Sequence, residues 1–162
     1  MTISTRHPTI EINRYRSADY PDRVDAALAK IESTPSGNHL LEGLKPLAAH
    51  GKKVLLNESP PWNPAPSAGA VFTDKQRRKY GERESEGEAA VELGLITKGR
   101  FCKGEGTNAT VNWSPGVGLM VDSEGRPQGQ SSEYAEQAFV GLAHELIHAK
   151  HIMSGDFKHG GD

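Results

Sequence analysis

Ala143-His144-Glu145-Leu146-Ile147-His148-Ala149 is an H-E-x-x-H sequence within an apolar, helix-forming run. Two histidines four positions apart lie one turn from each other on the same helical face, so both imidazoles can bind one Zn²⁺. The glutamate beside them is placed to act as general base toward a zinc-bound water. The sequence therefore predicts a zinc site with His144 and His148 as ligands and Glu145 as the catalytic residue.

The helix that carries this motif is expected to begin near Ser131 or Ser132, either of which can cap it, and to run to about Met153. At 100° per residue, one apolar stripe forms. The members of this stripe are Phe139, Leu142, Leu146, Ala149 and Met153. Because the flank is apolar too, we expect a buried helix in the middle of the domain, with the motif histidines on the face opposite the stripe.

A zinc site of this kind needs a third protein ligand. No glutamate follows Glu145, and the chain after His148 lacks the glycine and histidine spacing of H-E-x-x-H-x-x-G-x-x-H. Asp156 is the preferred candidate, because the break at Ser154-Gly155 allows the chain to turn and return a carboxylate to the metal. The alternative is a helix-capping or surface aspartate.

Other third ligands stay open. His151 is on the motif face, but its Cα lies about 10 Å along the helix axis from that of His144, which suits a tetrahedral site poorly. His159, or a carboxylate or tyrosine elsewhere, is a further alternative.

The rest of the chain alternates between helical and strand patterns. Strands are expected over 9–13, 54–56, 107–113 and 117–121, the last two forming a hairpin, and helices over 19–31 and 38–49. Pro46 is expected to kink the second helix or end it near Lys45. Residues 57–69 hold four of the ten prolines and predict a loop or extended segment, and the charged segment 73–92 predicts a solvated helix or mobile loop.

Residues 107–113 suggest a place for a bound peptide. Proteins with this motif commonly hold a substrate as an added strand on an exposed sheet edge. We expect Thr110, Val111 and Asn112 to bind substrate in this way; the alternative is an ordinary core strand.

Length, charge and cysteine content narrow the class of protein to which the chain can belong. The 162 residues predict one α+β domain over 1–162, with flexible ends at 1–8 and 157–162. A net charge of −2 gives no sign of nucleic acid or membrane binding, and no apolar run approaches the ~20 residues of a membrane span. The single cysteine, Cys102, excludes an intramolecular disulfide and suits a reducing compartment. The first eight residues lack the apolar core of a secretory signal peptide.

Three quoted segments together resemble a known family. They are Gly104-Glu105-Gly106-Thr107-Asn108-Ala109-Thr110-Val111-Asn112-Trp113-Ser114-Pro115, Leu142-Ala143-His144-Glu145-Leu146-Ile147-His148-Ala149 and Met153-Ser154-Gly155-Asp156. This pattern is similar to the NleD-like zinc metalloproteases, bacterial effectors injected into host cells by type III secretion. The resemblance is clearest over residues 104–156, a third of the chain.

The resemblance implies a zincin-like fold, a Zn²⁺ cofactor, action in the host cytoplasm and cleavage of host signalling proteins, with MAP-kinase-like targets. It carries over His144 and His148 as ligands and Glu145 as the catalytic residue. One alternative is a zinc-containing binding module that engages a host protein without cleaving it, although structural zinc has no use for Glu145 as a base. Others are a cytosolic housekeeping or DNA-repair protease, and a metal-free helical protein with an accidental motif.

Overall fold

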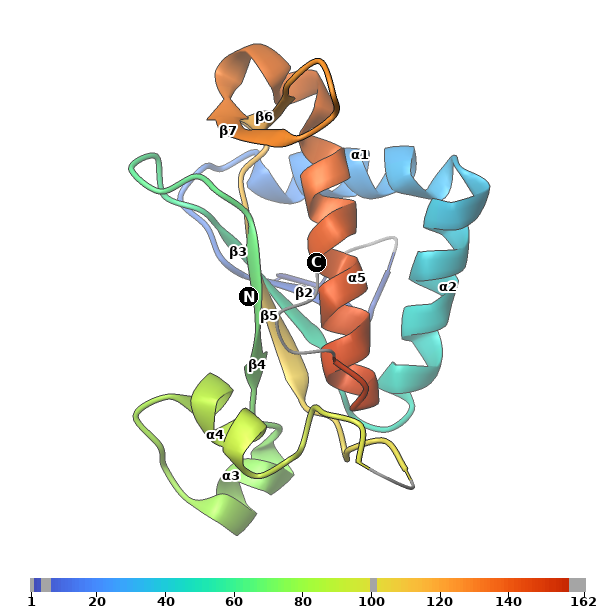
Figure 1. Cartoon of the computed structure of the whole chain (residues 1–162), viewed down its shortest axis with the longest axis vertical. Helices are drawn as coiled ribbons and strands as arrows, with labels where there is room; N and C mark the ends of the chain where they lie inside the picture. Colours follow the sequence, from blue (N-terminus) through green and yellow to red (C-terminus); the bar gives the residue numbers. More distant parts are fainter. Residues whose placement is uncertain (1, 4–6, 100–101, 158–162) are drawn as a thin grey trace.

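A computed structural model of the chain describes residues 2–3, 7–99 and 102–157 (Figure 1). The strands are β1 (Thr2–Ile3), β2 (Ile10–Arg14), β3 (Val54–Glu58), β4 (Ser67–Val71), β5 (Asn108–Trp113), β6 (Gly118–Val121) and β7 (Pro127–Ser131). The helices are α1 (Tyr20–Glu32), α2 (Pro35–Ala48), α3 (Asp74–Tyr80), α4 (Glu86–Glu92), the 3₁₀ helix η1 (Ser132–Gln137) and α5 (Ala138–Ser154). The fold is mixed α+β with a small sheet, as predicted. The expected flexibility of the chain ends falls largely outside the described residues.

Five strands form the main sheet in the order β1-β2-β3-β5-β4. The central strands β2, β3 and β5 are parallel, while β1 and β4 pair antiparallel at the two edges. The remaining pair, β6 and β7, forms a separate two-stranded sheet beside the start of α5 (Figure 1). The predicted strands near residues 9–13, 54–56, 107–113 and 117–121 are confirmed as β2, β3, β5 and β6.

Side chains alternate between the two faces of the sheet, and one face carries the core. Val54 and Leu56 of β3, with Ala109 and Val111 of β5, are fully buried. Helices α1 and α2 pack against α5, which itself contacts β4 and β5 and runs lengthwise over this face (Figure 1). The sheet therefore supports the motif helix directly. No helix in the described part of the chain is long and apolar enough to cross a membrane.

One local prediction in the β segments is wrong. Residues 107–113 and 117–121 do not form a hairpin, because β5 is hydrogen-bonded on both sides by β3 and β4 and β6 pairs with β7 instead. The segment 57–69, predicted as a loop or extended segment, ends in a strand, since β4 begins at Ser67. The signal for β4 is weak, because Ser, Ala and Gly have low strand propensity.

The helical predictions hold with shifted ends. Helix α2 starts at Pro35, three residues earlier than expected, where Thr34 Oγ1 accepts a hydrogen bond from Gly37 N at 3.1 Å. Pro46 lies inside α2 without ending it. The charged segment 73–92 contains two short helices, α3 and α4, rather than one.

Candidate metal centre

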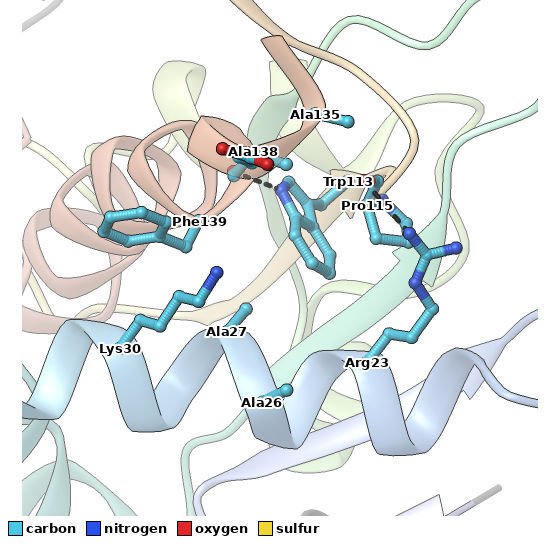
Figure 2. A pocket seen from close by; sticks show the side chains of 10 residues that line it. Arg23, Ala26, Ala27, Lys30, Trp113, Pro115, Ala135, Ala138 and Phe139 are labelled. Atoms are coloured by element: carbon cyan, nitrogen blue, oxygen red, sulfur yellow. Dashed lines mark hydrogen bonds between the residues drawn. The ribbon is translucent and has the colours of Figure 1, made fainter. Parts of the chain in front are cut away.

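The motif helix is positioned at its first residue by a tryptophan from the sheet. Trp113, at the end of β5, is buried, and its Nε1–H donates to the carbonyl oxygen of Ala138 at 2.8 Å (Figure 2). Before Ala138 the chain forms η1, which is capped by Ser131 Oγ accepting from Glu133 N at 3.2 Å. The predicted single helix from 131–132 is thus a 3₁₀ turn followed by α5, and the tryptophan fixes where α5 begins.

A small pocket of about 140 Å³ lies between α1 and the start of α5, and Figure 2 shows the side chains that line it. Arg23 and Lys30 of α1 flank it, and Trp113 and Phe139 supply aromatic walls. None of the three motif residues lines this pocket. The candidate metal centre therefore lies outside this pocket, further along α5.

One side of α5 is fastened to the core. Leu142, Leu146, Ala149 and Met153 are fully buried, which confirms four of the five residues of the predicted apolar stripe, and Phe139 is half-buried against the core. On the other side His144 is exposed and His148 is half-buried. Val140 and Ile147 are also exposed, so the expectation of a helix buried around most of its circumference is wrong. One face of α5 is open to solvent, and the motif histidines are on it.

The imidazoles of His144 and His148 converge. Their Nε2 atoms are 3.1 Å apart, and their rings meet edge to face with centroids 4.7 Å apart. Two ligand atoms at 2.0–2.1 Å from one tetrahedral ion lie about 3.3 Å from each other, so this pair fits a shared Zn²⁺. The ring of Phe157 packs edge-on against His148 at 5.9 Å between centroids and restricts its orientation.

Glu145 occupies a different environment from the histidines beside it. Its side chain is only 7 % exposed, although α5 is open to solvent on the neighbouring face. On a regular helix it lies about 60° around the axis from His148. The carboxylate is therefore shielded from bulk water at the border between the core stripe and the histidine face.

The structure pairs Asp156 with His151 and Lys103. Gly155 ends α5 in the left-handed conformation (φ 75°), and Asp156 N then donates to the His151 carbonyl at 3.0 Å. This turn returns the carboxylate to His151, with Oδ1 at 3.0 Å from Nδ1, while Oδ2 is 3.4 Å from Lys103 Nζ. Burial acts to raise the pKa of Asp156, but the bonds from His151 and Lys103 outweigh it and lower that pKa.

Asp156 therefore does not meet the expectation of a third ligand in this arrangement. Within residues 2–3, 7–99 and 102–157, no three His, Cys, Asp or Glu side chains gather into a group that could hold a metal ion. His159, the other candidate in the C-terminal tail, lies outside the described residues. The histidine pair is thus the part of the predicted site that the fold brings together.

The predicted substrate-binding residues lie on β5, a strand in the interior of the main sheet. Because β5 is bonded to β3 and to β4, it has no free edge for a peptide. Val111 is fully buried; Thr110 Oγ1 accepts from Asn57 Nδ2 at 2.9 Å, and Asn112 Nδ2 donates to Ser67 Oγ at 3.0 Å. These side chains hold the sheet together, and the expected exposed edge at β5 is wrong.

The edge strand next to the motif helix is β4. It is the last strand of the main sheet, and no further strand pairs with it among the described residues. Pro66, just before β4, packs against α5 so closely that a Cβ at Gly141 would lie 3.4 Å from its Cγ. The open edge of the sheet thus runs beside the first turns of α5.

Comparison with known proteins identifies the family of this chain. A comparison with curated proteins finds no match. The model of the Peptidase M91 family, described as "Effector protein", matches residues 8–162. That range includes the motif helix, strands β2 to β5 of the main sheet and both helices packed against α5. The chain therefore belongs to the Peptidase M91 family of effector proteins.

Proposed function

We propose that this chain is a zinc-dependent endopeptidase delivered by type III secretion into the host cytoplasm, where it cleaves host signalling proteins, with MAP kinases as candidate targets. Membership of a peptidase family of effectors supports its action on a host protein. The single observation that carries the chemistry is the convergence of His144 Nε2 and His148 Nε2 at 3.1 Å on the open face of α5.

In this mechanism His144 and His148 would hold the ion, because their imidazole Nε2 atoms converge. When bound there, Zn²⁺ supplies Lewis acidity, which polarises the scissile carbonyl and makes water a better nucleophile at neutral pH. Glu145 accepts the proton of the attacking water on its carboxylate and passes it to the leaving amine. Its low exposure keeps bulk water from competing for that carboxylate. A zinc-containing module that only binds a host protein would not need a shielded carboxylate beside the two imidazoles.

The peptide is held in extended form along β4. The edge of a sheet offers unpaired N–H and C=O groups that bind a peptide backbone independently of its side chains. The side chains along β4 are small, with Ala68, Gly69 and Ala70 in the middle of the strand. This edge therefore suits a substrate that must lie close to the sheet and to α5.

Zinc content and cleavage together test this proposal. We expect His144→Ala and His148→Ala to lose zinc in elemental analysis and to lose cleavage of a mixed peptide pool. Glu145→Gln should keep its zinc and lose cleavage by about 10²–10⁴-fold, the usual contribution of a general base. His50→Ala is the matched control, because His50 is an exposed histidine outside the motif. Zinc content and cleavage that survive in His144→Ala would contradict the proposal.

A further inference from the structure

The open face of α5 carries two large apolar side chains next to the histidine pair. Val140 is 49 % exposed and Ile147 is 46 % exposed. Val140 lies one helical turn before His144, and Ile147 lies about one turn after it. Single exposed apolar residues are common on proteins, but two that bracket a candidate zinc-binding histidine form an apolar patch beside the candidate site.

These residues form one wall of a groove of about 320 Å³ between α5 and the α1–α2 corner, here called the α5–α2 groove. Val140, Ala143 and Ile147 line it from α5, and Ile31 and Leu40 line it from α1 and α2. Its size is at the lower end of the range for sites that bind small molecules or side chains. The groove is therefore a preformed apolar recess directly beside the motif.

The polar lining of the groove is positively charged or neutral. Lys150 and the histidines His39 and His151 lie along it, and no described lining residue is acidic. Lys150 extends across α2, where a Cβ at Gly43 would lie only 2.8 Å from its Nζ. Lys150 is the one lysine or arginine among the described residues that line the groove, so the apolar groove complements an apolar group that has a carboxylate next to it.

We infer that the α5–α2 groove is a specificity site that binds one large apolar side chain of the cleaved peptide, with an acidic residue beside it in the peptide sequence. This inference rests on the peptidase function proposed above. A peptide whose scissile bond reaches His144 and His148 from the β4 edge crosses the open face of α5. Val140 and Ile147 lie on that face, within about 60° of His144 around the helix axis, so the neighbouring side chain of the peptide covers them.

Cleavage of a proteome-derived peptide library tests the groove. The proteins compared are wild type, Val140→Ala/Ile147→Ala, Lys150→Glu and Val91→Ala, with Glu145→Gln as background. Val91→Ala is the matched control, because Val91 is 39 % exposed and lies on α4. For wild type we expect Leu, Ile, Met or Phe at one fixed position from the cleaved bond, and Asp or Glu next to it.

The double variant should lose the apolar preference and lower kcat/KM for a preferred peptide about tenfold or more, while Val91→Ala behaves as wild type. Lys150→Glu should lose only the acidic preference. Cleavage by wild type without a fixed apolar position, or with one that the double variant retains, would overturn the groove assignment alone. Absence of cleavage above the Glu145→Gln background would overturn the proposed function and this inference with it.

A second copy of the chain is the competing occupant, and sedimentation velocity separates the two. We expect wild type and the double variant to sediment alike. A wild-type dimer that the double variant dissociates would assign the groove to self-association and overturn the inference.

Discussion

His151 Nδ1 lies 3.0 Å from Asp156 Oδ1, and this contact ties the residue after the α5 cap back to the last turn of the motif helix. The carboxylate also reaches Lys103 at 3.4 Å, on the segment that leads into β5. Asp156 therefore connects the end of the motif helix to the approach to the central sheet, and each oxygen of its carboxylate has a partner of its own.

Replacing Asp156 with Ala is expected to leave the zinc content unchanged, as measured by elemental analysis. The free energy of unfolding should fall by no more than about 1 kcal/mol, because the ion pairs of Asp156 with His151 and Lys103 are partly exposed and screened by solvent. Lys103→Ala should act in the same direction with a smaller effect. A variant that folds but has lost its zinc would show that Asp156 is a ligand after all.

Trp113→Phe tests how the start of α5 is held. The substitution keeps the ring in the core but removes the N–H that donates to Ala138 O, so the free energy of unfolding should fall by about 1–2 kcal/mol in urea denaturation. Trp62→Phe is the matched control; Trp62 is 75 % exposed, and its substitution should change stability by no more than about 0.5 kcal/mol. Equal effects of the two substitutions would contradict this role for Trp113.

The sequence predicted the motif helix better than it predicted which strands pair. The α5 stripe and the two histidines on its opposite face followed from helical periodicity, because a helix presents a fixed face every 3.6 residues. Strand partners did not follow, because pairing depends on contacts between distant segments. β5 pairs with β4, whose Ser67-Ala68-Gly69-Ala70 sequence follows a proline-rich segment and carries little strand signal.

The same limit applies to the candidate site. His144, Glu145 and His148 are adjacent in sequence, so local spacing was enough to place them near one another. The position of the Asp156 carboxylate depends on the left-handed Gly155 and on Lys103, which is 53 residues away in the sequence. The α5–α2 groove depends on how α1 and α2 pack against α5, which the periodicity of one helix does not predict.

Thr110→Val tests the correction at β5. The variant loses the hydroxyl that accepts from Asn57, so the free energy of unfolding should fall by about 1 kcal/mol. Because β5 has no free edge, KM for a cleaved peptide should stay as in wild type. An increase in KM without any loss of stability would show that Thr110 contacts the substrate.

We expect the stability difference between Glu58→Gln and wild type to depend on pH. Glu58 accepts hydrogen bonds from the backbone N–H groups of Arg16 and Ser17 at 2.6 and 3.0 Å, and from Ser17 Oγ–H at 2.6 Å. Burial acts to raise the pKa of Glu58, but these bonds outweigh it and hold the pKa below its ordinary value of 4.5.

A carboxylate whose pKa is lower in the folded state stabilises the fold above the unfolded-state pKa, and this stabilisation is lost as the pH falls through the folded-state pKa. Glu58→Gln should therefore be less stable than wild type at pH 7 in urea denaturation, and the difference should shrink as the pH falls below about 4.5. Glu92→Gln, at the exposed end of α4, is the control and should show no such change. A stability difference that does not depend on pH would contradict this role for Glu58.

If Glu145, beside His144 and His148, makes this chain a peptidase that acts on host proteins, wild type should cut proteins in host-cell lysate and Glu145→Gln should not. Mass spectrometry of new protein N-termini in lysate incubated with each protein measures this difference. We expect a small set of new termini with wild type that are absent with Glu145→Gln, although both proteins carry zinc. The same termini in both samples, or none in either, would contradict it.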